Sequence, residues 1–213
     1  MANLLVVFVP TGIPPLVELK PMAPRLGNLN GKRVALLNAM FDVTGAFLDQ
    51  LQDWFRQNMP GVETFVVEIE NSRGDGVPIS ERGNIQDKGH LERIKADADA
   101  AIVGLGLCAS CTQAVSGTVM RLETEYGIPA VGVHNSAFKA LNQAVVKNQG
   151  MPYLRLAYTP SPVVNVPAPR LREYIDGVDP VNKRPFMDVV LDALTVPVGQ
   201  DEIDAAKAGL VAA

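Results

Sequence analysis

The chain contains two cysteines, Cys108 and Cys111, and they lie three residues apart in one short segment. An apolar run precedes this segment and a stretch of helical periodicity follows it, so we expect both thiols in the first turn of a helix. Unpaired backbone N–H groups at a helix N-terminus favour the thiolate and lower the thiol pKa below its ordinary value of about 8.5. The spacing also lets the two sulfurs meet, so the pair can cycle between dithiol and disulfide.

Polar residues that follow the other expected strands are further candidates, because open parallel sheets bind ligands at the carboxyl ends of their strands. Ser110 and Thr112, with the local N–H groups, are expected to hold a carboxylate or a developing oxyanion. His134 ends the next strand and is a candidate general acid or base near Cys108, while a hydrogen bond to a loop carbonyl is the structural alternative. The other candidate substrate-binding residues are Asn38, Asn135 and Ser161.

Four more polar residues have a structural interpretation beside a functional one. Asp42 follows the first expected strand and either binds the substrate or caps the next helix. His90 lies in a polar helical segment and is expected at the surface. Arg25 and Arg155 are expected to be surface charges, with an acidic substrate as the alternative partner.

The spacing of the candidate ligands argues against a metal or a nucleotide. His90 and His134 lie on opposite sides of the cysteine pair, without the paired spacing of a structural zinc site. Gly104, Gly106 and Ala109 satisfy a loosened dinucleotide fingerprint, but they follow the third expected strand and the next strand lacks the ribose-binding acid. We therefore expect no metal and no cofactor.

The composition is that of one compact domain: 213 residues, of which 47% are hydrophobic and 20% charged. Lys and Arg number 19 against 23 Asp and Glu, and no basic run exceeds a dipeptide, so we expect no nucleic-acid partner. The longest apolar stretch, residues 4–9, is far shorter than the roughly 20 residues that cross a bilayer. No Lys or Arg precedes it as in a signal peptide, so we expect a cytoplasmic protein without a membrane partner.

Short apolar runs alternate with helical periods, which predicts an α/β fold. The fold class we expect is a single domain with a mostly parallel five-stranded sheet flanked by helices, flavodoxin-like or like one half of a racemase. Strands are expected at 32–38, 62–69, 100–106, 129–134 and 154–158, and helices at 44–58, 80–96, 110–126 and 136–148. The third strand is almost free of polar side chains, which is typical of a central parallel strand.

The two ends of the chain differ from this core, which we place at residues 31–165. Residues 1–30 contain five of the sixteen prolines and predict an extended arm, with a possible strand at 4–9. Residues 166–213 predict a helical tail, with helices at 169–175, 180–194 and 201–210 that are apolar on one face. Both ends favour a homo-oligomer.

The cysteine segment resembles the motif of the UGSC family, in which selenocysteine or cysteine is followed by Gly, Ser and Cys. Here residues 108–111 read Cys-Ala-Ser-Cys, and the resemblance runs over roughly residues 8–162, including segments 10–12, 23–26, 29–32 and 127–129. It implies that Cys108 holds the selenocysteine position and does nucleophilic or redox chemistry.

Three positions depart from the family pattern. Ala109 replaces the motif glycine, Leu107 replaces an acidic residue, and residues 160–162 lack a histidine at Ser161. These departures favour a subfamily with an altered substrate.

A looser resemblance is to the aspartate/glutamate racemases and arylmalonate decarboxylases. There a cysteine after a parallel strand acts as a cofactor-free acid or base. This resemblance implies a thiolate that acts on a small carboxylic acid held by N–H donors.

Three functional hypotheses follow for a protein whose partner is a small molecule. In the first, Cys108 forms a covalent or mixed-disulfide intermediate with a small organic substrate, and Cys111 resolves it. In the second, a redox-neutral lyase, hydrolase or isomerase uses Cys108 alone. In the third, the protein binds a ligand or senses redox state without turnover.

Overall fold

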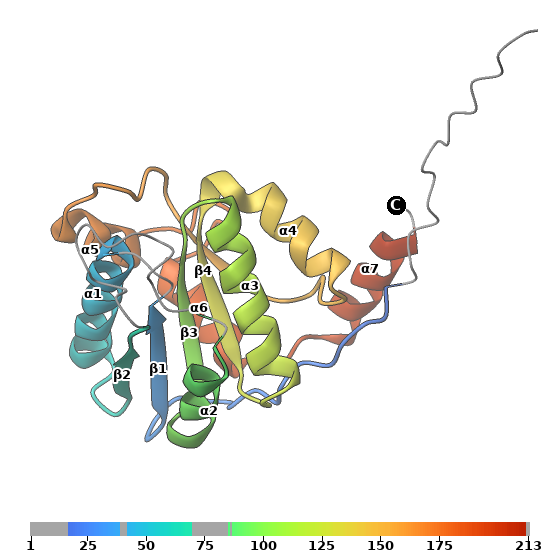
Figure 1. Ribbon diagram of the computed structural model, residues 1–213, viewed down its shortest axis with the longest axis horizontal. Helices are drawn as coiled ribbons and strands as arrows, with labels where there is room; N and C mark the ends of the chain where they lie inside the picture. Colours follow the sequence, from blue (N-terminus) through green and yellow to red (C-terminus); the bar gives the residue numbers. More distant parts are fainter. Residues whose placement is uncertain (1–16, 39–41, 70–84, 86, 212–213) are drawn as a thin grey trace, which may run out of the picture.

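Five parallel strands form one sheet through the centre of the molecule (Figure 1). The computed structural model describes residues 17–38, 42–69, 85 and 87–211. The strands are β1 (Arg33–Asn38), β2 (Glu63–Val67), β3 (Ala100–Gly106), β4 (Ala130–Asn135) and β5 (Leu156–Thr159). Their order is β2-β1-β3-β4-β5, and every neighbouring pair is parallel. The prediction of a single α/β domain with a five-stranded parallel sheet is confirmed.

Helices cover both faces of the sheet. One face packs against α1 (Asp42–Asn58), α5 (Ala168–Asp176) and α6 (Phe186–Thr195), and the other against α2 (Lys88–Asp97), α3 (Ala109–Thr124) and α4 (Lys139–Asn148). Successive side chains of a strand point to opposite faces. In β1, Val34 and Leu36 accordingly join the core of the first face, while Ala35 and Leu37 join that of the second. Burial on both faces explains why the strands are apolar throughout.

The helix after β1 shows how the sequence pattern becomes packing. Phe47, Leu48, Leu51 and Phe55 recur at helical spacing and are all fully buried. The Phe47 ring meets the ring of Phe186 on α6 edge to face, with centroids 6.1 Å apart. This contact joins an early helix to the helical tail.

A glycine follows the helix that carries the cysteines. Gly127 has φ +65°, a conformation that costs other residues steric strain. The N–H of Ile128 reaches back to the carbonyl of Leu122, 2.9 Å away, and so satisfies one of the last carbonyls of α3. The helix expected at 110–126 thus ends two residues earlier, at Thr124 with Glu125 as its C-cap, and Gly127 turns the chain after it.

The helix expected at 180–194 begins six residues later, at Phe186. Residues before it form a turn in which Val178 bridges Pro185. The turn is fixed by Asp179, which is fully buried and accepts the backbone N–H groups of Val181 and Asn182. A buried carboxylate with local N–H donors therefore outcompetes helix formation here.

The same turn covers the outer edge of β5. Asp179 accepts the N–H of Tyr158 at 2.7 Å, and the Asn182 amide donates to the carbonyl of Leu156 at 2.9 Å. These side chains take the place of a neighbouring strand and leave fewer unpaired groups on the edge.

The described part of the expected arm, residues 17–30, has no helix or strand. It is hydrogen-bonded to later segments of the same chain. Lys20 N donates to Gly150 O, and Leu26 N donates to Leu194 O. The possible strand at 4–9 lies outside the described residues, and the homo-oligomer stays a prediction. Residues 80–84 and 86 of the helix expected at 80–96 also lie outside them.

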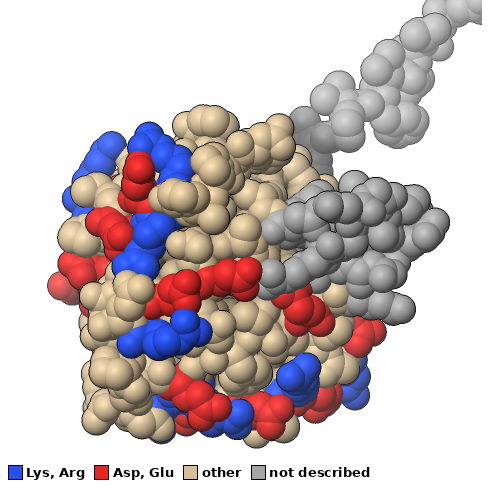
Figure 2. All heavy atoms as spheres, turned by 90° about the vertical axis from the view of Figure 1, so that its left-hand side faces the viewer, with Lys and Arg blue, Asp and Glu red and all other residues tan. Residues whose placement is uncertain are grey.

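The remaining elements are a short 3-10 helix, η2 (Ser136–Phe138), and the last helix, α7 (Gln200–Val211). Figure 2 shows Lys and Arg interspersed with Asp and Glu on the side of the molecule that carries α1 and α5, where ion pairs such as Arg172–Asp176 lie. No described helix is long and apolar enough to span a membrane.

Candidate functional site

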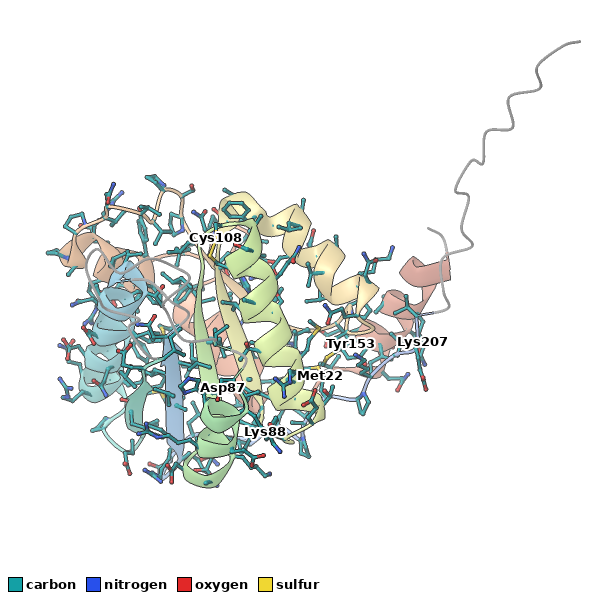
Figure 3. All side chains as sticks on the ribbon, viewed as in Figure 1. Met22, Asp87, Lys88, Cys108, Tyr153 and Lys207 are labelled. Atoms are coloured by element: carbon teal, nitrogen blue, oxygen red, sulfur yellow. A yellow bond between two sulfur atoms is a disulfide. The ribbon has the colours of Figure 1, made fainter. Side chains whose placement is uncertain are left out.

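Cys108 is the N-cap residue of α3, at the carboxyl end of β3 (Figure 3). Its backbone is extended, with φ −139° and ψ 175°, and its sulfur accepts the N–H of Cys111 at 3.3 Å. The Ser110 hydroxyl lies 3.3 Å from the same sulfur, and Thr112 N donates to the carbonyl of Cys108 at 2.8 Å. The first turn of the helix is thus built around the Cys108 sulfur.

The two cysteines are joined in a disulfide, with their Cα atoms 5.1 Å apart. They differ in exposure. Cys108 is half-buried, whereas Cys111 is only 2% exposed. In the reduced protein, a substrate can approach the Cys108 sulfur from solvent. The buried Cys111 sulfur can react with its neighbour Cys108.

The strand order places this turn at the switch point of the sheet. From β1 the chain proceeds to β2 on one side, and from β3 to β4 on the other. Loops that leave neighbouring strands in opposite directions open a crevice at their carboxyl ends, where ligands of such sheets bind. Cys108 follows β3 directly, and near this end of β3 the hydroxyl of Thr44 on α1 accepts Leu105 N at 3.4 Å.

Asn38 ends β1 beside Gly104 of β3, at the same edge of the sheet. Its side chain is fully buried, and its amide donates to a carboxylate oxygen of Glu68 at 2.7 Å. Asp42 is the first residue of α1. The structure therefore brings the end of β1 and the cysteine turn to one edge of the sheet, as the sequence predicts.

His134, at the end of β4, is completely buried. Its ring lies against two glycines: a Cβ on Gly106 would overlap Nδ1, and a Cβ on Gly132 would lie 2.7 Å from Nε2. Neither ring nitrogen has a hydrogen-bond partner among the described residues, so the expected alternative, a bond to a loop carbonyl, is wrong. Burial lowers the pKa of His134 to about 3, so the imidazole is neutral at physiological pH.

Other buried polar side chains lie on the same face of the sheet as this histidine, on α3, α4 and β5. We call Thr112, Ser116, His134, Asn142 and Tyr158 the internal polar cluster. The Ser116 hydroxyl donates to Asn142 Oδ1 at 2.5 Å, and the rings of His134 and Tyr158 have centroids 6.1 Å apart. Sequence reasoning missed Ser116, Asn142 and Tyr158. A usable signal was the spacing of Thr112 and Ser116, which puts two hydroxyls on one side of an otherwise apolar helix face.

The remaining predicted residues follow β4 and β5 at the same edge of the sheet. Asn135 caps η2, since its Oδ1 accepts the N–H of Ala137 at 3.0 Å. Ser161 is exposed in the segment after β5, and Ser110 is exposed in the cysteine turn. Their assignment as substrate-binding residues stays a prediction.

The two arginines have structural partners. The Arg25 side chain is buried and is not the surface charge expected from the sequence: its guanidinium binds both carboxylate oxygens of Glu123 at 2.9 Å, with side chains 2% and 0% exposed. Arg155 donates to the carbonyls of Val196 and Pro197 and pairs with Glu202 of α7. His90 lies half-buried on α2.

A cavity of about 740 Å³ lies beside β5, between α4, α6 and α7. Its polar lining includes Tyr153, Asn182 and Arg155, which the sequence offered as an alternative partner of an acidic substrate, whereas the cysteines and His134 do not line it. Tyr153 and Cys108 lie well apart in Figure 3. The cavity touches the internal polar cluster only through Tyr158.

Among the described residues, no group of three or more His, Cys, Asp or Glu side chains is arranged to hold a metal ion.

Comparison with known proteins gives one informative match. The model of the UGSC family matches residues 6–184, which includes the cysteine turn and every strand of the sheet. No curated protein matches the sequence.

Two solved structures are similar at a low level. One is a short-chain dehydrogenase/reductase (wide type) from Veillonella parvula DSM 2008 in complex with NADP, with 12% identity over 61% of this chain and 67% of that chain and a TM-score of 0.30. The other is a semialdehyde dehydrogenase NAD-binding protein from Cupriavidus necator in complex with calcium and NAD, with 11% identity over 83% of this chain and 57% of that chain and a TM-score of 0.31. At these scores neither structure gives information on a ligand of this chain.

Proposed function

This chain belongs to the UGSC family, and we propose that it is a cysteine-dependent enzyme acting on a small organic substrate in the cytoplasm. Cys108 is the nucleophile or redox thiol, and Cys111 is the resolving or supporting thiol. One observation carries the proposal: a half-exposed N-cap sulfur is bonded to a buried sulfur at the switch point of a parallel sheet.

The environment of Cys108 suits the attacking role. In the reduced protein, the N–H of Cys111 and the positive end of α3 stabilise the thiolate at this N-cap position. The Ser110 hydroxyl, 3.3 Å from the sulfur, is a further donor to a thiolate or to a developing oxyanion. Cys111 lacks such exposure, which suits a thiol that acts only on its neighbour.

A disulfide substrate gives a balanced reaction. The Cys108 thiolate attacks one substrate sulfur, the substrate S–S bond breaks, and the first thiolate leaves. The Cys111 thiolate then attacks the Cys108 sulfur, the second substrate thiolate leaves, and the Cys108–Cys111 disulfide forms. Two electrons pass from the cysteine pair to the substrate, and a dithiol reductant returns the pair to its reduced form.

A redox-neutral reaction is the second candidate. The N–H of Cys111 binds the Cys108 sulfur through the backbone, so the turn can activate Cys108 whatever the side chain at position 111 is. In this case Cys108 alone attacks or deprotonates a small acid, and the side chain of Cys111 supports the turn.

Counting the thiolates released from a small aromatic disulfide tests the proposal. Reduced wild-type protein is expected to release two equivalents per chain and to keep no adduct, since Cys111 resolves the mixed disulfide at Cys108. Cys111→Ser is expected to release one equivalent and to retain one adduct mass on the Cys108 peptide. Cys108→Ser is expected to react at least tenfold more slowly, at about the rate of an unactivated thiol.

Mass spectrometry distinguishes resolution from independent labelling of both thiols, which would leave two adducts on the wild-type chain. That result, or equal reaction rates of Cys108→Ser and Cys111→Ser, would contradict the assigned roles. Activated labelling of Cys108 without resolution would favour the redox-neutral candidate.

A further inference from the structure

The internal polar cluster contains buried atoms without partners. Thr112 on α3, His134 on β4 and Asn142 on α4 are all fully buried. The hydroxyl of Thr112, both ring nitrogens of His134 and the Asn142 Nδ2 have no hydrogen-bond partner among the described residues. Native interiors seldom leave such groups unsatisfied, and ordered water commonly supplies the missing partner. Side chains from three elements thus indicate a small polar site inside the protein.

The packing of α3 places this site beneath the cysteines. Val115 Cγ1 lies 3.3 Å from the position that a Cβ of Gly132 would occupy. Because α3 connects two parallel strands, it runs antiparallel to β4. One helical turn rises about 5.4 Å and two strand residues span about 6.6 Å. Cys111 and Thr112, one turn before Val115, therefore lie over His134, two residues after Gly132.

The other side of the histidine is closed by Tyr158, its direct neighbour on β5. Burial raises the pKa of Tyr158 to about 12, so this phenol stays neutral. Asn142 Oδ1 accepts the Ser116 hydroxyl at 2.5 Å, which fixes the amide between α3 and α4, and its Nδ2 has no partner among the described residues.

We propose that the internal polar cluster is a hydrated proton-transfer site, in which water held by Thr112, His134 and Asn142 carries the proton of the Cys111 thiol to the His134 imidazole. The inference rests on the proposed function, because it requires Cys111 to act as the resolving thiol. Thr112 and Asn142 are positioning residues, and His134 is the proton acceptor.

The step balances. The Cys111 S–H bond breaks, its proton moves through water to a ring nitrogen of His134, and the electron pair stays on sulfur. The thiolate attacks the Cys108 sulfur, the bond from Cys108 to the substrate sulfur breaks, and the substrate leaves as a thiolate. The imidazolium then gives its proton to that thiolate or to solvent.

A thiolate beside the ring is what allows a buried imidazole to hold a proton, since opposite charges attract strongly in a medium of low polarity. Among the described residues, the titratable side chains next to His134 are Tyr158 on β5 and, by the packing of α3 given above, Cys111; β3 contributes Gly106. Asp179 is next in line and accepts the backbone N–H of Tyr158. The charge at His134 is therefore expected to follow the redox state of the cysteine pair.

Nitrogen-15 NMR of the two imidazoles tests this link in the wild-type protein, with half-buried His90 on α2 as the internal reference. In the disulfide form, His134 is expected to stay neutral down to about pH 4, one unit above its pKa of about 3. In the reduced form, its titration is expected to move upward by at least one pH unit. Titration of His134 at the same pH in both forms overturns the proposal.

Release of the second thiolate from the aromatic disulfide gives an independent test. Thr112→Val removes the hydroxyl but keeps the shape, and is expected to slow the second release about tenfold, the low end of what positioned proton transfer contributes. The second release rate is compared with the first release rate of the same variant, so that an effect on substrate binding cancels. Thr118→Val is the matched control, because Thr118 is buried in the same helix and its hydroxyl donates to Ala114 O, outside the cluster.

Equal second-release rates in the two threonine variants would overturn the role of the cluster, while a wild-type protein that releases both thiolates would leave the proposed function standing. Failure of the wild-type protein to release the second thiolate would refute resolution by Cys111, and with it the proposed function. A redox-dependent titration of His134 in that protein would still show that the imidazole is coupled to the cysteines.

Discussion

The two ends of α3 differ in the pairing of their ionisable side chains: both oxygens of the Glu123 carboxylate are engaged, with the Nε of Arg25 left without a partner among the described residues, whereas neither nitrogen of the His134 imidazole is engaged. At the C-terminal end, Glu123 is buried and every oxygen is engaged: Arg25 binds both oxygens, and the N–H groups of Ala23 and Ala130 donate at 2.8 and 2.7 Å. At the N-terminal end, the hydroxyl of Thr112 and both nitrogens of His134 lack a partner among the described residues.

The difference separates a structural site from a functional candidate. The bonds of Glu123 tie the N-terminal segment, α3 and the start of β4 together, which stabilises one arrangement of these parts. Burial raises the pKa of Glu123, and Arg25 and the backbone donors oppose that rise. At the N-terminal end, the Thr112 hydroxyl and His134 nitrogens, which are unpaired among the described residues, lower the stability of the folded protein. Native proteins keep such unpaired polar groups mainly at functional sites.

Removing the Glu123 charge is expected to have the largest effect. Glu123→Gln leaves the buried Arg25 guanidinium without its counter-ion, which is expected to lower the free energy of unfolding by about 3–5 kcal/mol. Glu125→Gln is the matched control, since Glu125 ends the same helix but pairs with Arg121 at the surface, where about 0–1 kcal/mol is expected. Urea denaturation at pH 7 measures both. Equal losses of stability in the two variants would show that the buried Arg25–Glu123 pair stabilises the fold no more than the surface pair does.

Filling the space beside His134 is expected to have an intermediate effect. Gly106→Ala places a methyl group where the imidazole lies, and overpacking of this kind lowers stability by about 1–3 kcal/mol. His134→Ala removes the ring, so the double variant is expected to be more stable than the sum of the two single losses indicates. A double-mutant cycle from urea denaturation checks this, and additive losses would mean that the methyl group and the ring do not meet.

The smallest expected effect is the pH dependence of stability. His134 has a pKa of about 3 when folded and about 6.5 when unfolded, so the unfolded chain binds the proton more tightly between these values. Stability is therefore present above pH 6.5 and is lost as the pH falls toward 3, by up to about 1.4 kcal/mol per pH unit from this residue.

Denaturation of the disulfide form at pH 7, 6 and 5 measures that slope. His134→Asn is expected to flatten it relative to wild type, because the variant lacks the buried imidazole. An unchanged slope in His134→Asn would mean that the imidazole is solvated in the folded protein.

The elements around the cysteines were predictable because their signals are local. The apolar run of β3 has the bounds expected from sequence, and the helix after it starts one residue before the predicted position. The error at 180–194 arose because Asp179 is held by Tyr158, a residue 21 positions away, and so forms a turn where the local pattern favours a helix.

Long-range partners explain the other differences. Arg25 is predicted as a surface charge because nothing near it in the chain is acidic, yet its partner Glu123 is 98 residues away. His134 is predicted with a loop carbonyl as its alternative partner, and instead it lies between glycines of two strands. Neither contact has a local sequence signal.

The sequence by itself determined the alternation of strands and helices, the position of Cys108 and Cys111 in one helical turn, and the family resemblance, because each depends on residues close together in the chain. Tertiary structure alone decided the order that sets β3 beside β1, the burial of Cys111 against the exposure of Cys108, and the desolvation of His134. Burial is a property of what packs around a residue, and those neighbours come from distant segments.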